Sequence, residues 1–253
     1  MMLLTETCLI GHGIPSVSND ELIERWPSSV PLSMILDGKI ELLSMEEFVP
    51  FRCQELPRYN YFMVDNIPAG TYAFLTASGA MKAAELLGFS WVVSGGLGGI
   101  RPEARTDTVC PDLYALGNSS VKLLAIAFKD MVDYEATFAQ LRVQKSPYRF
   151  LESFVPGYIF KLESDLSLEM SSEEDCEGGL YLREIPVEKR IQDLELLSRG
   201  IAYGNEAVRA GKPFHPEVNG FFDRETDGYS SQIQFDTLLS NVEYLRQNYK
   251  NSE

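Results

Sequence analysis

The run Val121-Lys122-Leu123-Leu124-Ala125-Ile126-Ala127-Phe128 is largely apolar and leads directly into Lys129 and Asp130. Its length and its β-branched and aromatic residues predict a buried strand, and we expect a helix to begin near Asp130. Upstream, Trp91–Val93 predicts another buried strand, which feeds a glycine loop at Ser94–Gly99. Strands that alternate with helices over short loops favour a mostly parallel sheet covered on both faces. The sequence therefore predicts an α/β fold.

Other segments supply the remaining elements. Asp37-Gly38 between two apolar runs is the signature of a type I′ hairpin, and Ser18 and Ser44 are suited to cap helices. We expect buried strands over Leu3–Ile10 and 179–182. We expect helices over 76–87, 131–142, 187–210 and 231–249. We find no repeat and no linker, so residues 1–253 are expected to form a single domain.

The composition excludes several classes of protein. The 253 residues include 22 basic and 37 acidic ones, for a net charge of −15, and 45% are apolar. This balance argues for a globular protein and against binding to a nucleic-acid backbone, although one or two arginines could still hold a single phosphate. No apolar run reaches the roughly 18 residues that span a bilayer, and no signal peptide is visible. Four scattered cysteines without a CxxC pair favour reduced thiols, and we expect a cytoplasmic location.

Lys129 is the first candidate for a catalytic residue. It follows a strand of the predicted sheet, and ligands in such folds bind at the carboxyl ends of strands. The positive end of the helix expected at Asp130 disfavours a cation there, and a neutral lysine amine can form a Schiff base with a sugar aldehyde. The alternative is a solvated lysine in a turn.

The acidic candidates and the glycine loop each allow two interpretations. Arg101 stands where a dinucleotide-binding loop needs its third glycine, so the loop is either a tight turn or an anion cradle. Glu6 lies in an apolar segment, where a carboxylate must be paired, have a raised pKa suited to a general acid, or reach solvent. Asp112 either contacts a substrate or is a charge at a helix start. The two histidines lack the spacing of an HExxH zinc site.

Five segments, taken in order, resemble one family. Thr5–Pro15 is similar to its opening ESTxISHGMP, and Ser94–Ile100 to its TGGxGGVH. Cys110–Leu113 resembles SADLxEL, and Ala127–Asp133 lies where the family has AGxKSILD. Gly178–Pro186 resembles the later GGxxVANPIP. The chain therefore resembles the pseudouridine-5′-phosphate glycosidase family, also called indigoidine synthase A-like, over nearly its whole length.

The resemblance implies a three-layer α/β/α fold with a central mixed, mostly parallel sheet, and a homotrimer. It implies reversible cleavage or formation of the C–C bond between ribose 5-phosphate and uracil, with a divalent metal, typically manganese. By the same resemblance Lys129 is the nucleophile that forms a Schiff base and Glu6 the proton donor. Substrate contacts are implied for Cys110, Pro111 and Asp112, and phosphate contacts for Thr76 and Ala77.

Several positions depart from the family pattern. The metal aspartate falls at Thr108, which leaves Asp107 as the candidate ligand, so we expect a weak metal requirement or none. The substrate lysine falls near Pro50, and Arg52, Arg101 or Arg183 could replace it at a phosphate. A late asparagine falls near Gln232 or Gln234. The alternatives are an inactive relative that binds a sugar phosphate or serves as an assembly subunit, and an aldolase-like Schiff-base enzyme on another sugar phosphate.

Overall fold

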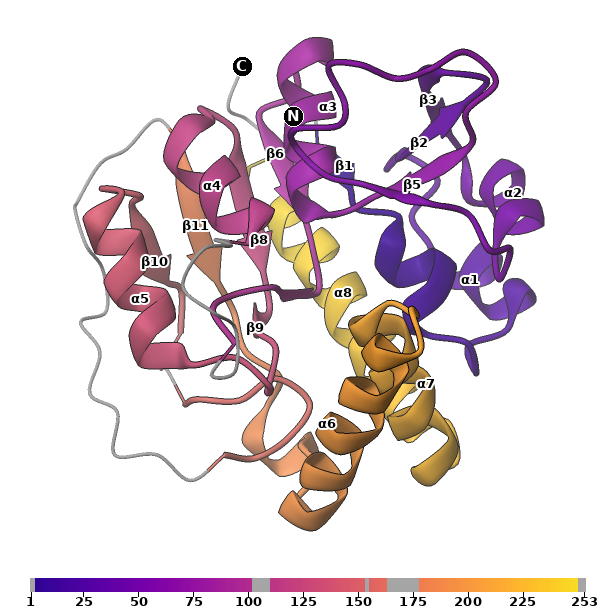
Figure 1. Ribbon diagram of the computed structural model, residues 1–253. Helices are drawn as coiled ribbons and strands as arrows, with labels where there is room; N and C mark the ends of the chain where they lie inside the picture. Colours follow the sequence, from indigo (N-terminus) through magenta and orange to yellow (C-terminus); the bar gives the residue numbers. More distant parts are fainter. Residues whose placement is uncertain (1–2, 102–109, 153–154, 163–177, 250–253) are drawn as a thin grey trace.

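The computed structural model describes residues 3–101, 110–152, 155–162 and 178–249, and a mixed sheet forms its centre (Figure 1). Nine described strands belong to this sheet, in the order β10, β11, β8, β6, β1, β2, β5, β4, with β3 paired to β2. The strands are β1 (Leu3–Thr5), β2 (Leu32–Leu36), β3 (Lys39–Leu43), β4 (Arg58–Tyr59), β5 (Ala73–Leu75), β6 (Trp91–Val93), β8 (Lys122–Ala125), β10 (Tyr148–Phe150) and β11 (Gly179–Leu182). A small second sheet pairs β7 (Gly96–Leu97) with β9 (Ala127–Phe128).

The directions of the strands confirm the mostly parallel sheet. From β10 across to β2 every pair is parallel, whereas β3 and β5 run antiparallel to β2, and β4 is parallel to β5. The carboxyl ends of β1, β6 and β8 therefore lie at one edge of the sheet. The chain brings β5 back toward this edge, where the Thr7 amide donates to the Leu75 carbonyl at 3.1 Å.

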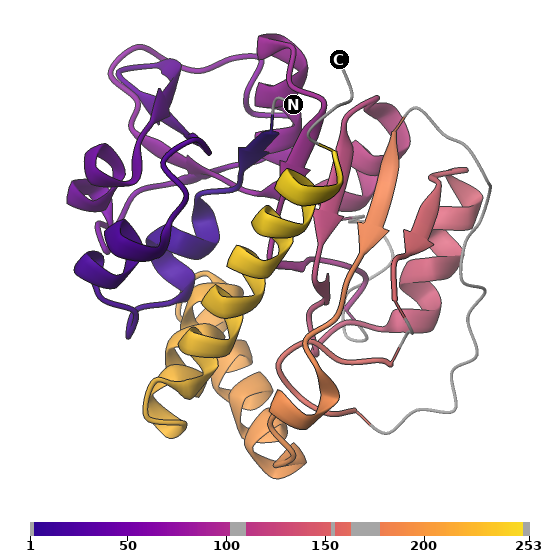
Figure 2. The ribbon, with the colours of Figure 1, turned by 180° about the vertical axis from the view of Figure 1, so that it is seen from behind.

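Helices cover both faces, which confirms the three-layer arrangement (Figures 1 and 2). The helices are α1 (Asn19–Arg25), α2 (Met45–Phe48), α3 (Ala77–Leu87), α4 (Pro111–Asn118), α5 (Tyr134–Val143), α6 (Leu194–Arg209), α7 (Phe214–Glu225) and α8 (Tyr229–Asn248). One apolar core packs α3, α4 and α5 against the sheet, and a second packs α1, α2 and α8 against its other face. Across the described ranges, no helix combines the length and apolarity that a bilayer crossing needs.

Helices α6 and α7 form a third packed unit beyond the carboxyl ends of the strands (Figure 1). They approach closely because glycines face large side chains: a Cβ at Gly200 would lie 2.2 Å from the Phe222 ring, and one at Gly204 would lie 2.3 Å from Val218. This helix pair brings the first turn of α7 to the edge of the sheet where the site residues gather.

The local signals for turns and caps are confirmed. Asp37 and Gly38 both have positive φ, at 49° and 79°, as a type I′ turn requires. Ser18 accepts a hydrogen bond from the Glu21 amide, and Ser44 forms a full capping box with Glu47. In both cases a side-chain oxygen satisfies a helix amide that would otherwise lack a partner.

Four boundary predictions are wrong. The expected strand Leu3–Ile10 stops at Thr5 and is followed by a π-helical turn over Leu9–Gly13. The strand expected over 121–128 divides at Ile126 into β8 and β9. The helix expected at Asp130 begins at Tyr134, because Asp133 caps it through the Ala136 amide. In the region 187–210, Val187–Lys189 forms only a 3-10 turn and α6 begins at Leu194. Helix α7 was not predicted.

Candidate functional site

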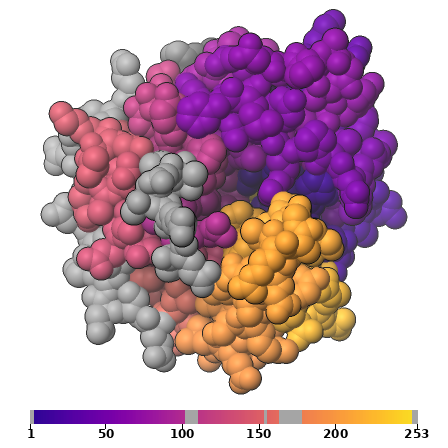
Figure 3. Space-filling view, in the orientation of Figure 1, coloured from indigo at the N-terminus to yellow at the C-terminus, as the bar shows by residue number. Residues whose placement is uncertain are grey.

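A pocket of about 370 Å³, including the open space at its mouth, lies at the carboxyl edge of the sheet. In the space-filling view, the surface is recessed between the orange helices α6 and α7 and the purple N-terminal half (Figure 3). Segments far apart in the sequence meet there: the end of β1, the π-helical turn, β4, the glycine loop, the end of β9 and the first turns of α7. The lining residues are Glu6, Cys8, Leu9, His12, Gly13, Arg58, Gly96, Lys129, His215, Pro216 and Asn219.

Lys129 enters the pocket from the end of β9. Its backbone amide donates to the Leu97 carbonyl at 2.9 Å, which extends the pairing of β7 with β9 and fixes the lysine beside the glycine loop. Within the described part of the chain its Nζ atom has no hydrogen bond or ion pair. Burial lowers the pKa of the Lys129 ammonium, and Arg58 adds to this, whereas Glu6 and Asp112 oppose it.

The cause of that shift differs from the one the sequence suggested. Because α5 begins at Tyr134, no helix start lies directly after Lys129. Removal from water therefore replaces the helix dipole as the main influence on the amine. The consequence is the same, because desolvation disfavours the ammonium and favours the neutral nucleophilic amine.

Glu6 lies one residue beyond β1, at its carboxyl end, and not inside a strand. It is only 7% exposed. Its Oε1 atom accepts hydrogen bonds from the Ser94 hydroxyl at 2.6 Å and from the Gly95 amide at 2.9 Å. Burial raises the pKa of Glu6, against the lowering effects of these two bonds and of Lys129. A carboxyl group with a raised pKa in a pocket can deliver a proton near neutral pH.

The glycine loop holds the two acidic residues of the site. Its Gly95 amide binds Glu6, and its Gly98 amide donates to Asp112 Oδ2 at 3.2 Å. The other oxygen, Asp112 Oδ1, accepts from the Ser78 amide in the first turn of α3 at 3.1 Å. The loop amides thus cradle anions, as one of the two sequence interpretations proposed, but these anions are carboxylates of the protein itself.

Arg58, on β4, is a site residue that the sequence did not single out. Among the described residues, its guanidinium has no hydrogen bond, ion pair or aromatic contact, yet it lines the pocket. Its charge acts on Lys129, His12 and His215. A half-buried guanidinium that faces a pocket without a counter-ion is suited to bind an anionic group of a ligand.

Both histidines line the pocket. His12 Nε2 lies 2.8 Å from the Gln54 carbonyl and so carries the proton, and burial lowers the His12 pKa. Burial lowers the His215 pKa well below its ordinary value, with Lys129, Arg58 and Arg101 adding to the effect. Both imidazoles are therefore neutral at pH 7. Asn219 follows His215 by one helical turn and lines the same wall.

Other residues singled out in the sequence lie around this pocket but do not line it. Thr76 caps α3, accepting from the Gly79 amide and donating to the Tyr59 carbonyl, and Ala77 follows as the first residue of α3. Cys110 and Pro111 begin α4 directly before Asp112, and burial raises the pKa of the Cys110 thiol well above its ordinary value. Arg101 stacks over the Phe214 ring, 5.0 Å from its centroid, beside His215.

Arg52 is used inside the protein. It donates to the carbonyls of Ile10 at 2.9 Å and Ile14 at 2.5 Å, and to the Asn19 side chain at 2.9 Å. These contacts anchor the π-helical turn and leave little donor capacity for a ligand, which argues against the expected phosphate contact of Arg52. Arg58 stands in the pocket instead.

The remaining candidates are Asp107, as a metal ligand, and Gln232 and Gln234, which fall near the family's late asparagine. Asp107 lies outside the described residues, and within the described ones no three His, Cys, Asp or Glu side chains are grouped to hold a metal ion. Gln232 contacts Glu21 and Asp236 at the surface. Gln234 is buried and accepts from the Tyr158 hydroxyl at 3.1 Å, close to the glycine loop.

The sequence analysis did not single out three polar side chains that line the pocket, namely those of Arg58, His215 and Asn219. Arg58 directly follows the Leu56-Pro57 pair, and a search for cations on both sides of that pair would have found it. His215 and Asn219 lie on α7, whose start is obscured by Pro213 and Pro216. Proline is tolerated in the first turn of a helix, so the His215–Asn219 spacing was a usable signal.

Together the residues provide a nucleophile, an acid and an anion contact in one pocket. A neutral Lys129 amine can attack a sugar carbon, Glu6 can move a proton, and Arg58 can hold a phosphate. Asp112 is fixed close enough to act on the Lys129 charge. This set fits imine chemistry on a phosphorylated sugar.

Comparisons with known proteins point to one family. The family model for indigoidine synthase A-like proteins matches residues 60–176. A pseudouridine-5′-phosphate glycosidase of Glaesserella parasuis is 27% identical over 94% of this chain and 88% of its own length. The enzyme of the same name from Herpetosiphon aurantiacus is 26% identical over 96% of this chain and 89% of its own length.

Two crystal structures share the fold. An indigoidine synthase A-like protein from Thermotoga maritima aligns with a TM-score of 0.76 at 20% identity, covering 95% of this chain and 89% of that one. The prealnumycin C-glycosynthase AlnA, solved with ribulose 5-phosphate, aligns with a TM-score of 0.72 at 16% identity, covering 96% of this chain and 90% of that one. Together with the near full-length sequence matches, this similarity shows that the chain resembles indigoidine synthase A-like proteins and pseudouridine-5′-phosphate glycosidases in sequence and in fold.

Proposed function

We propose that this protein is a lyase-type C-glycosidase that cleaves or forms the bond between ribose 5-phosphate and uracil through a Schiff base on Lys129. The observation that carries the proposal is the placement of Lys129 and Glu6 in one pocket, with Lys129 Nζ free of protein partners in the described chain. The names of the relatives, which are pseudouridine-5′-phosphate glycosidases, support this substrate.

The residue types follow from the bond to be broken. A C–C glycosidic bond has no heteroatom to protonate, so the two-carboxylate route of ordinary glycosidases does not suit it. In the cleavage direction the Lys129 amine bonds to C1′ as the ring oxygen leaves and takes a proton. The C1′–base bond then breaks, uracil keeps the electron pair and takes a proton at carbon, and the imine remains. Water hydrolyses the imine, releasing ribose 5-phosphate and the amine. Glu6 is the proposed carrier of these protons.

The test of activity is direct. The protein is incubated with pseudouridine 5′-phosphate, with and without Mn²⁺, and uracil is measured by chromatography; the reverse reaction starts from uracil and ribose 5-phosphate. We expect uracil in the first reaction and pseudouridine 5′-phosphate in the second. A folded protein that yields neither product contradicts the proposal.

We expect Arg58→Ala to weaken binding of the sugar phosphate with little effect on the chemical step. A hydrogen bond to a charged group contributes about 1.5–3 kcal/mol, so KM should rise about 10- to 100-fold. Steady-state kinetics with pseudouridine 5′-phosphate measure the change. Arg58→Lys is the control, because it keeps the charge and should recover part of the affinity. An unchanged KM in Arg58→Ala would place the phosphate elsewhere.

We expect any metal requirement to be weak, because Thr108 offers a neutral hydroxyl where the family has a carboxylate. Manganese, if it binds, has Asp107 as its candidate ligand. Treatment with EDTA followed by dialysis should lower the rate less than about tenfold, a loss of under about 1.4 kcal/mol of barrier stabilisation. Complete loss of activity with EDTA, and recovery with Mn²⁺ alone, would show the expectation to be wrong.

The alternative is an inactive relative that binds a sugar phosphate in the same pocket. The Arg58 guanidinium, without a partner in the described chain, would serve such a binder equally well. The two functions differ at Lys129, since only the enzyme must form a covalent adduct there. Calorimetry with ribose 5-phosphate that shows binding, combined with absence of any adduct on Lys129, would favour the binder.

We also propose a homotrimer, as the family resemblance implies. Phe62 and Met63 are 52% and 38% exposed, and the Phe62 ring packs against Tyr114 in a tilted arrangement with ring centroids 4.4 Å apart. Exposed apolar clusters of this kind often mark interfaces between proteins. Light scattering at micromolar concentration is expected to give three times the chain mass. A monomer mass there would contradict the proposal.

A further inference from the structure

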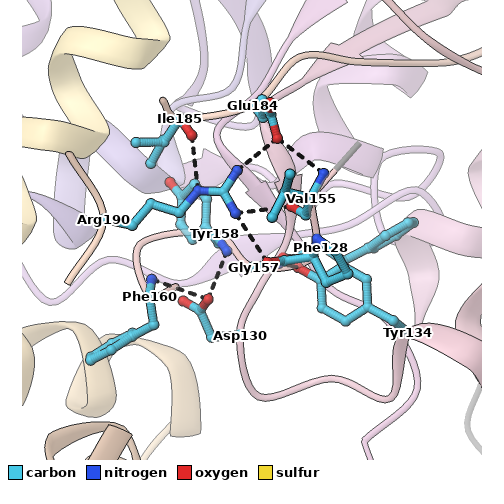
Figure 4. A network of polar contacts seen from close by, with 11 residues as sticks. Phe128, Asp130, Tyr134, Val155, Gly157, Tyr158, Phe160, Glu184, Ile185 and Arg190 are labelled. Atoms are coloured by element: carbon cyan, nitrogen blue, oxygen red, sulfur yellow. Dashed lines mark hydrogen bonds and ion pairs between the residues drawn. The ribbon is translucent and has the colours of Figure 1, made fainter. Parts of the chain in front are cut away.

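Asp130, the residue after Lys129, holds a distant segment of the chain by its backbone. Its carboxylate accepts three amide hydrogen bonds. Oδ1 accepts from Tyr158 at 2.6 Å and from Phe160 at 3.2 Å (Figure 4), and Oδ2 accepts from Ile159 at 3.1 Å. One buried side chain thus fixes three consecutive residues of what we call the clamped segment, residues 155–160. Because Asp130 is next to Lys129, the segment is tied to the start of the lysine side chain.

The other side of the clamped segment is held by Arg190. Its side chain is fully buried and donates to the carbonyls of Val155 at 2.9 Å and Pro156 at 3.0 Å. It also forms an ion pair with Glu184 at 2.8 Å, and Glu184 accepts from the Val155 amide (Figure 4). The segment is therefore anchored at both ends, and the charges involved are paired or hydrogen-bonded, as buried charges require.

Tyr158 connects the clamped segment to the glycine loop. Its hydroxyl donates to Gln234 at 3.1 Å and accepts from the Gly96 amide. Its ring occupies the space beside Gly96, where a Cβ would lie only 2.6 Å away. The amide of the neighbouring Gly95 binds Glu6. A continuous chain of contacts thus runs from Lys129 through Asp130, Tyr158 and the glycine loop to Glu6.

We propose that Asp130 is a positioning residue, which holds Lys129 in the pocket and, through Tyr158 and the glycine loop, fixes it relative to Glu6. The proposal rests on the proposed role of Lys129 as the reactive amine. A reactive pair must be held to a fraction of an ångström to be effective, and a rigid supporting network supplies that precision.

The charge of Asp130 is not what links this residue to Lys129. Asp130 is 7% exposed, and burial raises its pKa to about 6, against the opposing effects of its three amide bonds and Arg190. The charges that act most strongly on Lys129 are Glu6, Asp112, Arg58 and Cys110, and Lys129 in turn acts on His215. Asp130 therefore acts on Lys129 through geometry, and its loss should release the amine toward water.

The experiment measures the state of the amine without using the enzyme reaction. The folded protein is methylated with formaldehyde and cyanoborohydride over a range of pH, and mass spectrometry follows labelling of Lys129. The labelling midpoint reports the pKa of the amine. Asp130→Asn and Asp130→Glu are compared with wild type; the second keeps the negative charge but displaces it by one methylene. Asp223→Asn is the control, because Asp223 is also 7% exposed but binds Ser16 and Ser231 instead of the clamped segment, and its charge is not among those that act most strongly on Lys129.

We expect both Asp130 variants to raise the Lys129 midpoint by about one pH unit, which is about tenfold slower labelling below both midpoints. Asp223→Asn should leave it unchanged. A purely electrostatic role of Asp130 predicts the opposite sign for Asp130→Asn, since removing a nearby anion disfavours the ammonium. If the folded Asp130 variants leave the midpoint unchanged or lower it, the proposal is wrong, even where wild type releases uracil. A raised midpoint in a protein that releases no uracil would support the positioning role while the proposed function fails.

Discussion

Replacing Lys129 with arginine is expected to abolish uracil release while the protein stays folded. Arginine keeps the positive charge but its guanidinium is not a nucleophile and cannot form an imine. Removal of a covalent nucleophile commonly lowers kcat by about 10³-fold or more. The measurement is the rate of uracil formation from pseudouridine 5′-phosphate, together with circular dichroism to verify folding.

Lys122 provides the matched control. It lies at the start of β8, where its ammonium stacks over Trp91 at 5.5 Å from the ring centroid, away from the pocket. Lys122→Arg should therefore retain wild-type activity. Residual uracil release of more than a few per cent in Lys129→Arg would assign the nucleophile to another group.

Replacing Glu6 with glutamine is expected to lower kcat about 10²- to 10⁴-fold, the range for loss of a general acid or base. The pH profile carries the finer test. Lys129 must be neutral and Glu6 protonated, so the wild-type rate should rise with pH as the lysine deprotonates and fall as Glu6 does. Because burial raises the pKa of Glu6, the fall comes at a higher pH than an ordinary glutamate would give. The residual rate of Glu6→Gln should lack this fall.

The variant Ser94→Ala tests whether the falling limb of the pH profile reports the ionisation of Glu6. The Ser94 hydroxyl donates to Glu6 at 2.6 Å and lowers its pKa. Removing that hydroxyl should raise the pKa of Glu6 further and move the falling limb to higher pH, while activity is retained. If the falling limb of the pH–rate profile stays in place or moves to lower pH, the ionisation that causes it does not belong to Glu6.

Local chemistry made part of the fold predictable. The Asp37-Gly38 hairpin and the caps at Ser18 and Ser44 depend on a few neighbouring residues, and all three are confirmed. The extent of the first strand was not predictable in this way. The strand stops at Thr5, and the residues that follow are held by other contacts: the Thr7 hydroxyl donates to the Ser33 carbonyl at 2.9 Å, and Gly11 packs against the Phe74 ring, where a Cβ would lie 2.8 Å away. These partners are distant in the sequence.

In the site, too, some residues could be predicted from their local sequence and others depended on partners distant in the chain. Lys129 could be named because it follows an apolar run, and Glu6 because it is an acidic residue within one, each in a recognisable motif. The structure places both in one pocket. Arg52 and Arg58 could not be ranked from the sequence, because both are arginines in the same irregular region. Their roles depend on what they meet: Arg52 meets the carbonyls of the π-helical turn, whereas Arg58 meets the pocket.

His215 required tertiary information of another kind. It reaches the pocket only because α6 and α7 pack closely through Gly200 and Gly204, which sets the first turn of α7 against the end of the sheet. Likewise, Asp130 could be read as a helix start until its three amide partners in the clamped segment were known. Both contacts join segments far apart in the chain.

The central claim is that Lys129 forms an imine with the sugar, and reductive trapping tests it most directly. The protein is incubated with ribose 5-phosphate and borohydride, digested, and examined by mass spectrometry. The account predicts a reduced ribose 5-phosphate adduct on Lys129 and none on Lys122, with the adduct absent in Lys129→Arg. A folded, sugar-bound protein that carries no adduct on Lys129, or carries it equally on Lys122, would contradict the account.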